Sequence, residues 1–307
     1  MINLNTERGL IKVETFTEIK EIPGFLENLA PTEHIMDDVI GNYNFKAKTK
    51  CGLSTCHTPH NKGFIIKTTD GHITNIGHIC GKKHFNITFE TSVKTFEKIV
   101  DERDNRETIQ AFKAKIPILL KTFTLLKEQD RGIKWADTSA KIFSSPAKLP
   151  RPILKKLEDL KRSPKAEITI VRKMSEKETE IELERRNITR NFEEDTPPPV
   201  MYKEETVGRL EGIEILDEAN KFRKILVNDL EPKTHEASTI NEDLLTHKEL
   251  KEWAKWISGV DSKVKELNRL LALARKFFLE KNLEQLVNYA TEQEEETILR
   301  DAIRSVI

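Results

Sequence analysis

Cysteine and histidine, the residue types best suited to bind a transition metal, are concentrated in one short stretch of this 307-residue chain. All three cysteines and five of the eight histidines lie there: Cys51, Cys56, His57, His60, His72, His78, Cys80 and His84. Thiolates and imidazoles together form the ligand set of a tetrahedral zinc ion. Three cysteines cannot all pair with one another, and their clustering with histidine favours a metal over a disulfide framework. The sequence therefore predicts a zinc site in this stretch.

The same stretch also predicts the elements that would position these ligands. Cys51 and Cys56 stand at the two ends of a turn rich in Gly, Ser and Thr. The segments GFIIK (63–67) and HITNI (72–76) are separated by TTDG. They predict a β-hairpin, because Asp-Gly between short apolar strands favours a tight turn. Cys80 comes next, and a helical pattern follows after Thr91.

This order of a knuckle, a hairpin and ligands near a helix start resembles the treble-clef zinc finger over residues 45–90. In that family two ligands come from the knuckle and two from the first turn of the helix. The resemblance implies a closed, structural zinc site with four ligands: Cys51, Cys56, Cys80 and His84. The chain departs from the usual pattern in the four-residue gap of its knuckle and in its Cys-x3-His pair. His60 and His78 therefore stay open as alternatives to His84.

Positive charge is the second feature of this stretch. From Asn44 to His84 there are seven lysines and one acidic residue, Asp70, whereas the whole chain has 51 basic and 51 acidic residues. Such local charge favours contacts with phosphates, which position a protein on nucleic acid without reading its sequence. We predict a nucleic-acid-binding face made of six lysines: Lys46, Lys48, Lys50, Lys62, Lys82 and Lys83. The alternative is that these lysines only keep a small finger soluble.

The surplus histidines also permit a hydrolytic interpretation. Nucleases of the His-Asn-His class are built on a similar hairpin and helix, and this stretch offers comparable groups: Asp70, His72, Asn75, His78 and His84. His72 and Asn75 lie too close in the sequence for the three positions of that family to fall in register. The chain contains no GxxxxGK[ST], GxGxxG or GxSxG motif. We therefore predict no catalytic residues.

The rest of the chain is mostly helical by its apolar spacing. Apolar residues recur at spacings of three and four after Ser92, and again after a capping box of Thr246 and Glu249. Pro117 should kink the first of these helices or divide it near Ile116. Between the two helical parts, EITIV, EIELE, GIEIL and KILVN predict strands, and NFEEDTPPPV predicts an exposed loop. A short amphipathic helix is predicted over residues 15–29.

These patterns predict an α+β fold that is mostly helical, with an embedded treble-clef-like zinc finger and a small antiparallel β module. We divide the chain into five parts: an N-terminal arm (1–44), the zinc finger (45–91), a helical region (92–163), the small β module (164–232) and a C-terminal helical bundle (233–307). Modules of this kind serve many functions, so the fold alone does not identify one.

The predicted function is that of a non-enzymatic nucleic-acid-binding accessory or adaptor protein, for which a DNA-processing or defence assembly is one setting. Its finger would contact the phosphates of DNA or RNA, and its helical faces would hold a protein partner. Two alternatives stay open, a protein-interaction scaffold with a purely structural zinc site and a metal-dependent His-Asn-His-like nuclease. No segment reaches the length of a membrane-spanning helix and the first residues lack the features of a signal peptide, so we expect a soluble, cytoplasmic protein.

Overall fold

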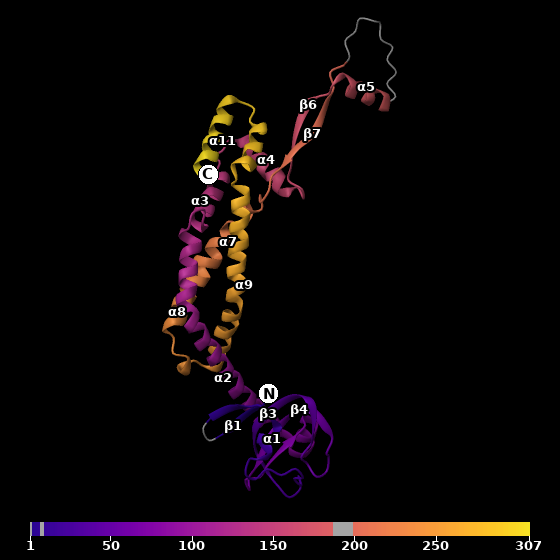
Figure 1. The fold of residues 1–307 in the computed structure, drawn as a ribbon, viewed down its shortest axis with the longest axis vertical. Coiled ribbons are helices and arrows are strands. Elements are labelled where there is room, and N and C mark those ends of the chain that lie inside the picture. The colour runs from indigo at the N-terminus through magenta and orange to yellow at the C-terminus, as the bar shows by residue number, and fades with distance from the viewer. Residues whose placement is uncertain (1, 7–8, 187–198) are drawn as a thin grey trace. The chain divides into compact units, whose positions relative to one another are not determined.

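The computed structural model describes three segments of the chain: residues 2–6, 9–186 and 199–307. Most of these residues are helical and a small antiparallel sheet accompanies them, so the predicted α+β class is confirmed (Figure 1). The chain forms two compact units. Unit 1 comprises Met1–Ala114 and Ile240–Ser258, and unit 2 comprises Lys115–Thr239 and Gly259–Ile307.

Unit 1 is built on a five-stranded antiparallel sheet with the order β2-β1-β3-β4-β5. The strands are β1 (Ile2–Thr6), β2 (Gly9–Val13), β3 (Met36–Lys50), β4 (Pro59–Thr68) and β5 (Ile73–Ile76). The predicted hairpin is confirmed as the pair β4 and β5. The boundary predicted at residue 44 falls inside β3, so the N-terminal residues and the predicted finger share one sheet.

The sheet has a hydrophobic core on each face, because successive side chains along a strand point to opposite sides. Ile65 of β4 packs with Ile2 and Tyr43 on one face. Its neighbour Ile66 packs on the other face, in a core that also contains Cys51 and side chains of helix α2 (His78–Glu128). The cysteine stretch is therefore anchored in the larger of the two cores.

The N-terminal helix is shorter than predicted. α1 spans only Phe16–Lys20, and a capping box of Thr15 and Glu18 starts it. Pro23 and Gly24 follow, and the φ of Gly24 is 87°. A Cβ at Gly24 would lie 2.9 Å from the carbonyl oxygen of Gly71. Only a glycine at this position therefore lets the chain approach the β4–β5 turn so closely.

Helix α2 begins earlier than predicted and contains one break. Asn86 has a φ of 47° and a ψ of −130°, which separates a short first segment from the long second one. Of the two outcomes predicted for Pro117, division of the helix does not occur, because this residue lies inside α2 and the non-helical backbone within that helix is at Asn86. Proline removes one backbone hydrogen bond, and the buried side chains of Ile116 and Phe123 hold the helix on either side of it.

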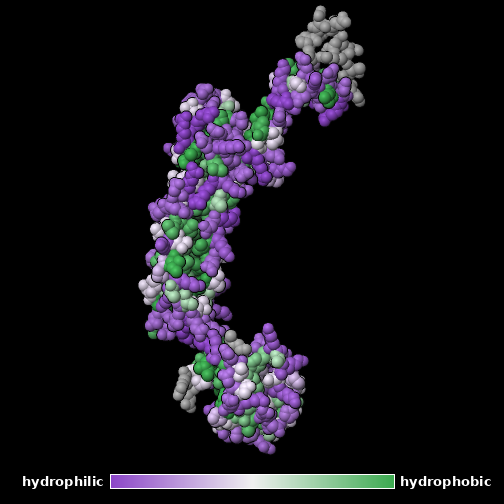
Figure 2. All heavy atoms as spheres, viewed as in Figure 1, coloured by the Kyte–Doolittle hydropathy of each residue, from purple (hydrophilic) through white to green (hydrophobic). Residues whose placement is uncertain are grey.

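Unit 2 consists mainly of packed helices, and η2 (Glu242–Leu244) with the start of α9 belongs to unit 1. The remaining elements are α3 (Ile133–Phe143), α4 (Arg151–Arg162), α5 (Glu176–Arg185), α6 (Ile215–Glu218), α7 (Asn220–Phe222), η1 (Arg223–Leu230), α8 (Glu231–Thr239), α9 (His247–Phe277), α10 (Glu280–Leu283), η3 (Glu284–Tyr289) and α11 (Gln293–Val306). An aromatic cluster of Trp135, Phe143, Phe277 and Phe278 joins α3 to the end of α9. Figure 2 shows hydrophobic side chains interspersed with hydrophilic ones along the helices of this unit.

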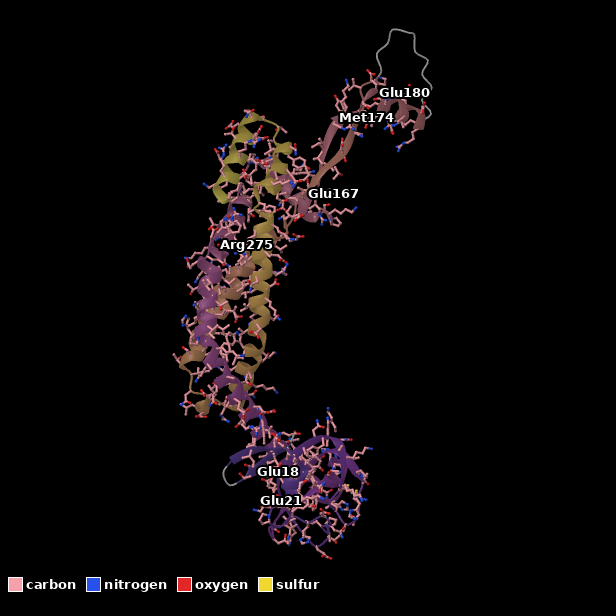
Figure 3. The ribbon with its side chains drawn as sticks, in the orientation of Figure 1. Glu18, Glu21, Glu167, Met174, Glu180 and Arg275 are labelled. Atoms are coloured by element: carbon pink, nitrogen blue, oxygen red, sulfur yellow. The ribbon has the colours of Figure 1, made fainter. Side chains whose placement is uncertain are left out.

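The only sheet described in unit 2 is a hairpin of β6 (Glu167–Lys173) and β7 (Tyr202–Arg209). Of the four predicted strands, EITIV is confirmed as β6, whereas GIEIL and KILVN lie in turns and helices. EIELE lies in α5, which a capping box starts: the N–H of Ser175 donates to Glu178 Oε2 over 2.9 Å. Figure 3 labels Glu167 at the start of β6, Met174 directly after its end, and Glu180 on α5.

The predicted loop NFEEDTPPPV lies almost wholly outside the described residues. Among the helices in the described segments, none combines the length and the apolar character needed to span a bilayer.

Candidate metal centre

The three cysteines come together in unit 1. Cys51 directly follows β3, Cys56 lies in the turn before β4, and Cys80 lies in the first turn of α2. Their Sγ atoms all lie within 4.8 Å of one another, and those of Cys56 and Cys80 are 3.2 Å apart. All three are free thiols, and Cys51 is only 1% exposed. This cluster could bind one metal ion, and its soft sulfur donors favour a thiophilic metal.

Backbone hydrogen bonds hold the turn that carries the first two thiols. The N–H of Cys51 donates to the carbonyl oxygen of Thr58 over 3.2 Å, and the N–H of Cys56 donates to that of Leu53 over 3.1 Å. Leu29 makes two further hydrogen bonds to the turn from outside it. Its N–H donates to the carbonyl oxygen of Gly52 over 2.8 Å, and its carbonyl oxygen accepts from the N–H of Ser54 over 2.9 Å. The positions of the two thiols are therefore fixed by the fold itself.

Gly52 allows the hairpin to approach this turn closely. Its N–H donates to the carbonyl oxygen of Asn75 on β5 over 2.8 Å. A Cβ at Gly52 would lie 2.1 Å from Thr74 Oγ1, which is far inside van der Waals contact. A glycine between Cys51 and the rest of the turn is therefore a packing requirement.

The position of Cys80 depends on the break in α2. The left-handed backbone of Asn86 turns the chain, and Phe89 packs back on the first segment. A Cβ at Gly81 would lie 2.4 Å from the Phe89 ring, so the contact needs glycine. Phe89 is fully buried, and its ring centroid lies 5.4 Å from that of Phe64 on β4. The third thiol is thus carried on a short segment that is packed against the sheet.

The surroundings of the three sulfur atoms differ. The hydroxyl and the N–H of Thr58, 3.3 and 3.5 Å from Cys56 Sγ, lower the pKa of Cys56 to about 7. Burial raises the pKa of Cys51, although the N–H groups of Leu53 and Gly77 donate to its sulfur. Burial also raises the pKa of Cys80 to about 12. A metal at this cluster must therefore displace protons when it binds.

The fourth ligand implied by the treble-clef resemblance is not brought into the group. Among the described residues, no histidine joins the three thiols within 4.8 Å. His60 Nε2 is 2.5 Å from the Tyr43 hydroxyl and its Nδ1 is 3.0 Å from the Thr58 oxygen, so both nitrogens have partners. His78 packs its ring against Phe89, with centroids 5.7 Å apart. His84 lies about one helical turn after Cys80 on the same short segment.

A buried polar network behind the thiols was not predicted. Tyr43 on β3 is 3% exposed, and its hydroxyl accepts a hydrogen bond from Asn75 Nδ2 over 3.1 Å in addition to its contact with His60. Asn75 also donates to the carbonyl oxygen of Lys50 over 2.8 Å. Burial raises the pKa of Tyr43, so its hydroxyl stays neutral. Asn75, considered from the sequence as part of a nuclease site, therefore has a structural role here.

Tyr43→Phe should lower the free energy of unfolding of unit 1 by about 1–3 kcal/mol, because His60 and Asn75 would each lose a partner in the core. Hydrogen exchange over β3 and β4 in increasing urea measures this loss. Tyr202→Phe is the matched control, since Tyr202 is 62% exposed and lies in unit 2. An equal effect of both substitutions would contradict the prediction.

The six predicted nucleic-acid-binding lysines are all exposed, and they lie on three elements: Lys46, Lys48 and Lys50 on β3, Lys62 on β4, and Lys82 and Lys83 on α2. Lys82 Nζ is 2.7 Å from Glu90 Oε1, so its charge is partly neutralised. Lys48 and Lys50 line an open cavity of about 550 Å³ whose wall also includes Cys51 and His57. Two of the six lysines therefore line the same cavity as Cys51, one residue of the thiol cluster.

The groups considered for a nuclease are not brought together. Asp70 and His72 lie in the turn between β4 and β5, where the structure groups them with His34. His78 and His84 lie on α2, and β5 separates them from that turn. His34 stood alone in the sequence, so no spacing signal pointed to this neighbourhood.

Comparisons of the chain with protein-family models, with curated proteins and with solved structures found no match.

Proposed function

We propose that this protein binds single-stranded nucleic acid through a basic cavity in unit 1, next to a structural zinc ion held by Cys51, Cys56 and Cys80. The observation that carries the proposal is the shared wall: Lys48, Lys50 and Cys51 line one cavity. Loss of the metal would therefore disturb the binding surface as well as the fold. Non-enzymatic binding of this kind suits an accessory or adaptor protein.

Zinc is the metal that the donor set supports best. Three thiolates in reach of one ion are typical of closed structural zinc sites, which take a fourth nitrogen or sulfur ligand. The order of knuckle, hairpin and helix supports the treble-clef resemblance. His84 is our candidate for the fourth ligand, because it lies one helical turn from Cys80 and His60 has both ring nitrogens occupied.

The cavity offers both kinds of contact that a nucleotide needs. The half-buried rings of Phe16 and Phe25 lie in its wall and provide a surface on which an unpaired base can stack. Lys20 in the same wall pairs with Glu27 over 2.5 Å, so the uncompensated charge comes from Lys48 and Lys50. Within the described segments, no carboxylate forms an ion pair with either of these two lysines. Stacking next to free ammonium groups favours a single strand over a duplex.

Replacing Lys48 and Lys50 together with glutamine should weaken binding of a labelled single-stranded oligonucleotide without changing its sequence preference. Each lost phosphate contact should reduce the slope of log affinity against log salt by about one, so the double variant should lose about two. Fluorescence anisotropy of the full chain, titrated at several salt concentrations, measures both quantities.

Lys67→Gln is the matched control for this experiment. It removes an exposed lysine near the other end of β4, whereas Lys50 pairs with Pro59 at the start of that strand. Lys67 lies eight positions after Pro59, which corresponds to about 26 Å along the strand. Absence of binding at low salt, or an equal loss with Lys67→Gln, would overturn the proposal, and the first of these results would favour the protein-interaction scaffold. Cleavage of the oligonucleotide would favour the nuclease instead.

A further inference from the structure

A second group of metal-binding side chains lies at the turn of the β4–β5 hairpin. His34 stands shortly before β3, and Asp70 and His72 lie in the turn itself. His34 Nδ1 is 2.7 Å from Asp70 Oδ2, and His72 Nε2 is 3.7 Å from the same oxygen. One ligand atom from each residue lies within 4.8 Å of the other two. The two imidazole rings meet edge to face, with centroids 5.1 Å apart.

Backbone hydrogen bonds hold the two segments that carry these residues. The N–H of Thr69 donates to the carbonyl oxygen of Ile35 over 2.9 Å, which ties the turn to the segment of His34. Inside the turn, the N–H of Thr68 donates to the His72 oxygen over 2.8 Å, and that of Gly71 donates to the Thr68 oxygen over 2.9 Å. The three side chains therefore project from a connected backbone, as a preorganised ligand set requires.

We propose that His34, Asp70 and His72 bind a divalent transition-metal ion at a second site, distinct from the three-thiol centre. Two imidazole nitrogens and one carboxylate oxygen suit Zn²⁺, Fe²⁺, Co²⁺ or Ni²⁺. The side chains are 18%, 46% and 38% exposed, so water can complete the coordination. Three protein ligands with open positions are typical of reactive sites and not of closed structural ones.

Position and donor type separate this site from the thiol cluster. The four residues of β5 span about 13 Å and lie between His72 and the helix that carries Cys80, so one ion cannot serve both groups. The thiols favour a soft metal, whereas the second site offers only nitrogen and oxygen donors. The chain would therefore hold two metal ions, and the ion at the exposed second site would exchange more readily than the ion at the thiol centre.

A simpler role for this group is a hydrogen-bonded link between two loops. That link needs only His34 and Asp70, whose contact is already short. His72 supplies a third donor that the link does not use, and its ring still faces the shared oxygen. A bound metal ion would replace the contact between His34 Nδ1 and Asp70 Oδ2 and would use His72 as well. The two roles therefore differ in their dependence on His72.

Cobalt can test the second site in the full 307-residue chain while zinc fills the thiol centre. Co²⁺ bound by nitrogen and oxygen donors absorbs weakly in the visible range, and Co²⁺ bound by thiolates adds charge-transfer absorption in the near ultraviolet. We expect one equivalent of Co²⁺ to bind saturably with visible absorption alone. His72→Ala and His34→Ala should each abolish this absorption and leave the zinc bound at the thiol centre unchanged. The zinc content also reports that both variants are folded.

His235→Ala is the matched control, because it removes an exposed imidazole from α8 in unit 2 and should leave cobalt binding unchanged. The proposal is overturned if the unsubstituted protein shows no saturable cobalt absorption. It is also overturned if the absorption persists in His72→Ala and His34→Ala, since cobalt would then be bound elsewhere.

Discussion

Cys51→Ser is expected to abolish metal binding at the three-thiol centre and to destabilise unit 1 strongly. Cys51 is the most buried of the three thiols and is part of the core that joins the sheet to α2, and a serine hydroxyl is a poor ligand for a thiophilic metal. Structural zinc contributes on the order of 10 kcal/mol to the folding free energy of isolated finger peptides. The loss of stability in Cys51→Ser should be smaller, because unit 1 keeps a sheet with a hydrophobic core on each face.

Two measurements check this expectation. The zinc content of the purified protein, determined after dialysis against a weak chelator that strips open sites, should fall to background in Cys51→Ser. The thermal unfolding temperature of unit 1 should fall with it. Thr55→Ala is the control, since Thr55 is exposed in the same turn and carries no sulfur. Full zinc content in Cys51→Ser would show that the thiols do not hold the metal.

The hairpin could be predicted because its signals are local. An Asp-Gly turn between two short β-branched strands favours one pairing and one register, and β4 and β5 adopt it. The convergence of Cys51, Cys56 and Cys80 followed from the same local order of turn, hairpin and helix. Ligand types with suitable spacing therefore predicted which thiols meet.

The sequence left the fourth ligand open among His84, His60 and His78, and it gave no signal for the group of His34, Asp70 and His72. His84 lies on the short first segment of α2, which ends at the positive φ of Asn86. His34 reaches Asp70 only because the N-terminal residues and the hairpin belong to one sheet. Contacts between residues far apart in the sequence depend on tertiary packing, and no periodicity within a single segment reports them.

The errors in the region 164–232 have a different cause. Apolar residues alternate in EIELE, but the segment is too short to separate a strand from a helix by its period. The capping box of Ser175 and Glu178 was the stronger signal, and it starts α5. The strand β7 was missed because its sequence, YKEETVGR, is mostly polar and its residues are half-buried or exposed.

Phe89→Ala is expected to lower the free energy of unfolding of unit 1 by about 3–5 kcal/mol, the usual cost of removing a buried phenyl ring. Phe89 is 0% exposed and contacts the rings of Phe64 and His78. Its ring also covers Gly81, so it holds the segment of Cys80 against the sheet. The substitution should therefore weaken metal retention as well as the fold, which links the core to the three-thiol centre.

Hydrogen exchange over β4 and β5 in increasing urea measures the loss of stability, and competition with a chromophoric chelator measures the loss of metal affinity. Ile87→Ala is the matched control, because Ile87 lies on the same helix but is 78% exposed, and its effect should stay within about 0.5 kcal/mol. Destabilisation by Phe89→Ala with unchanged metal affinity would show that the position of Cys80 does not depend on this ring. Both effects together would establish that the packing of α2 on the sheet positions the third thiol.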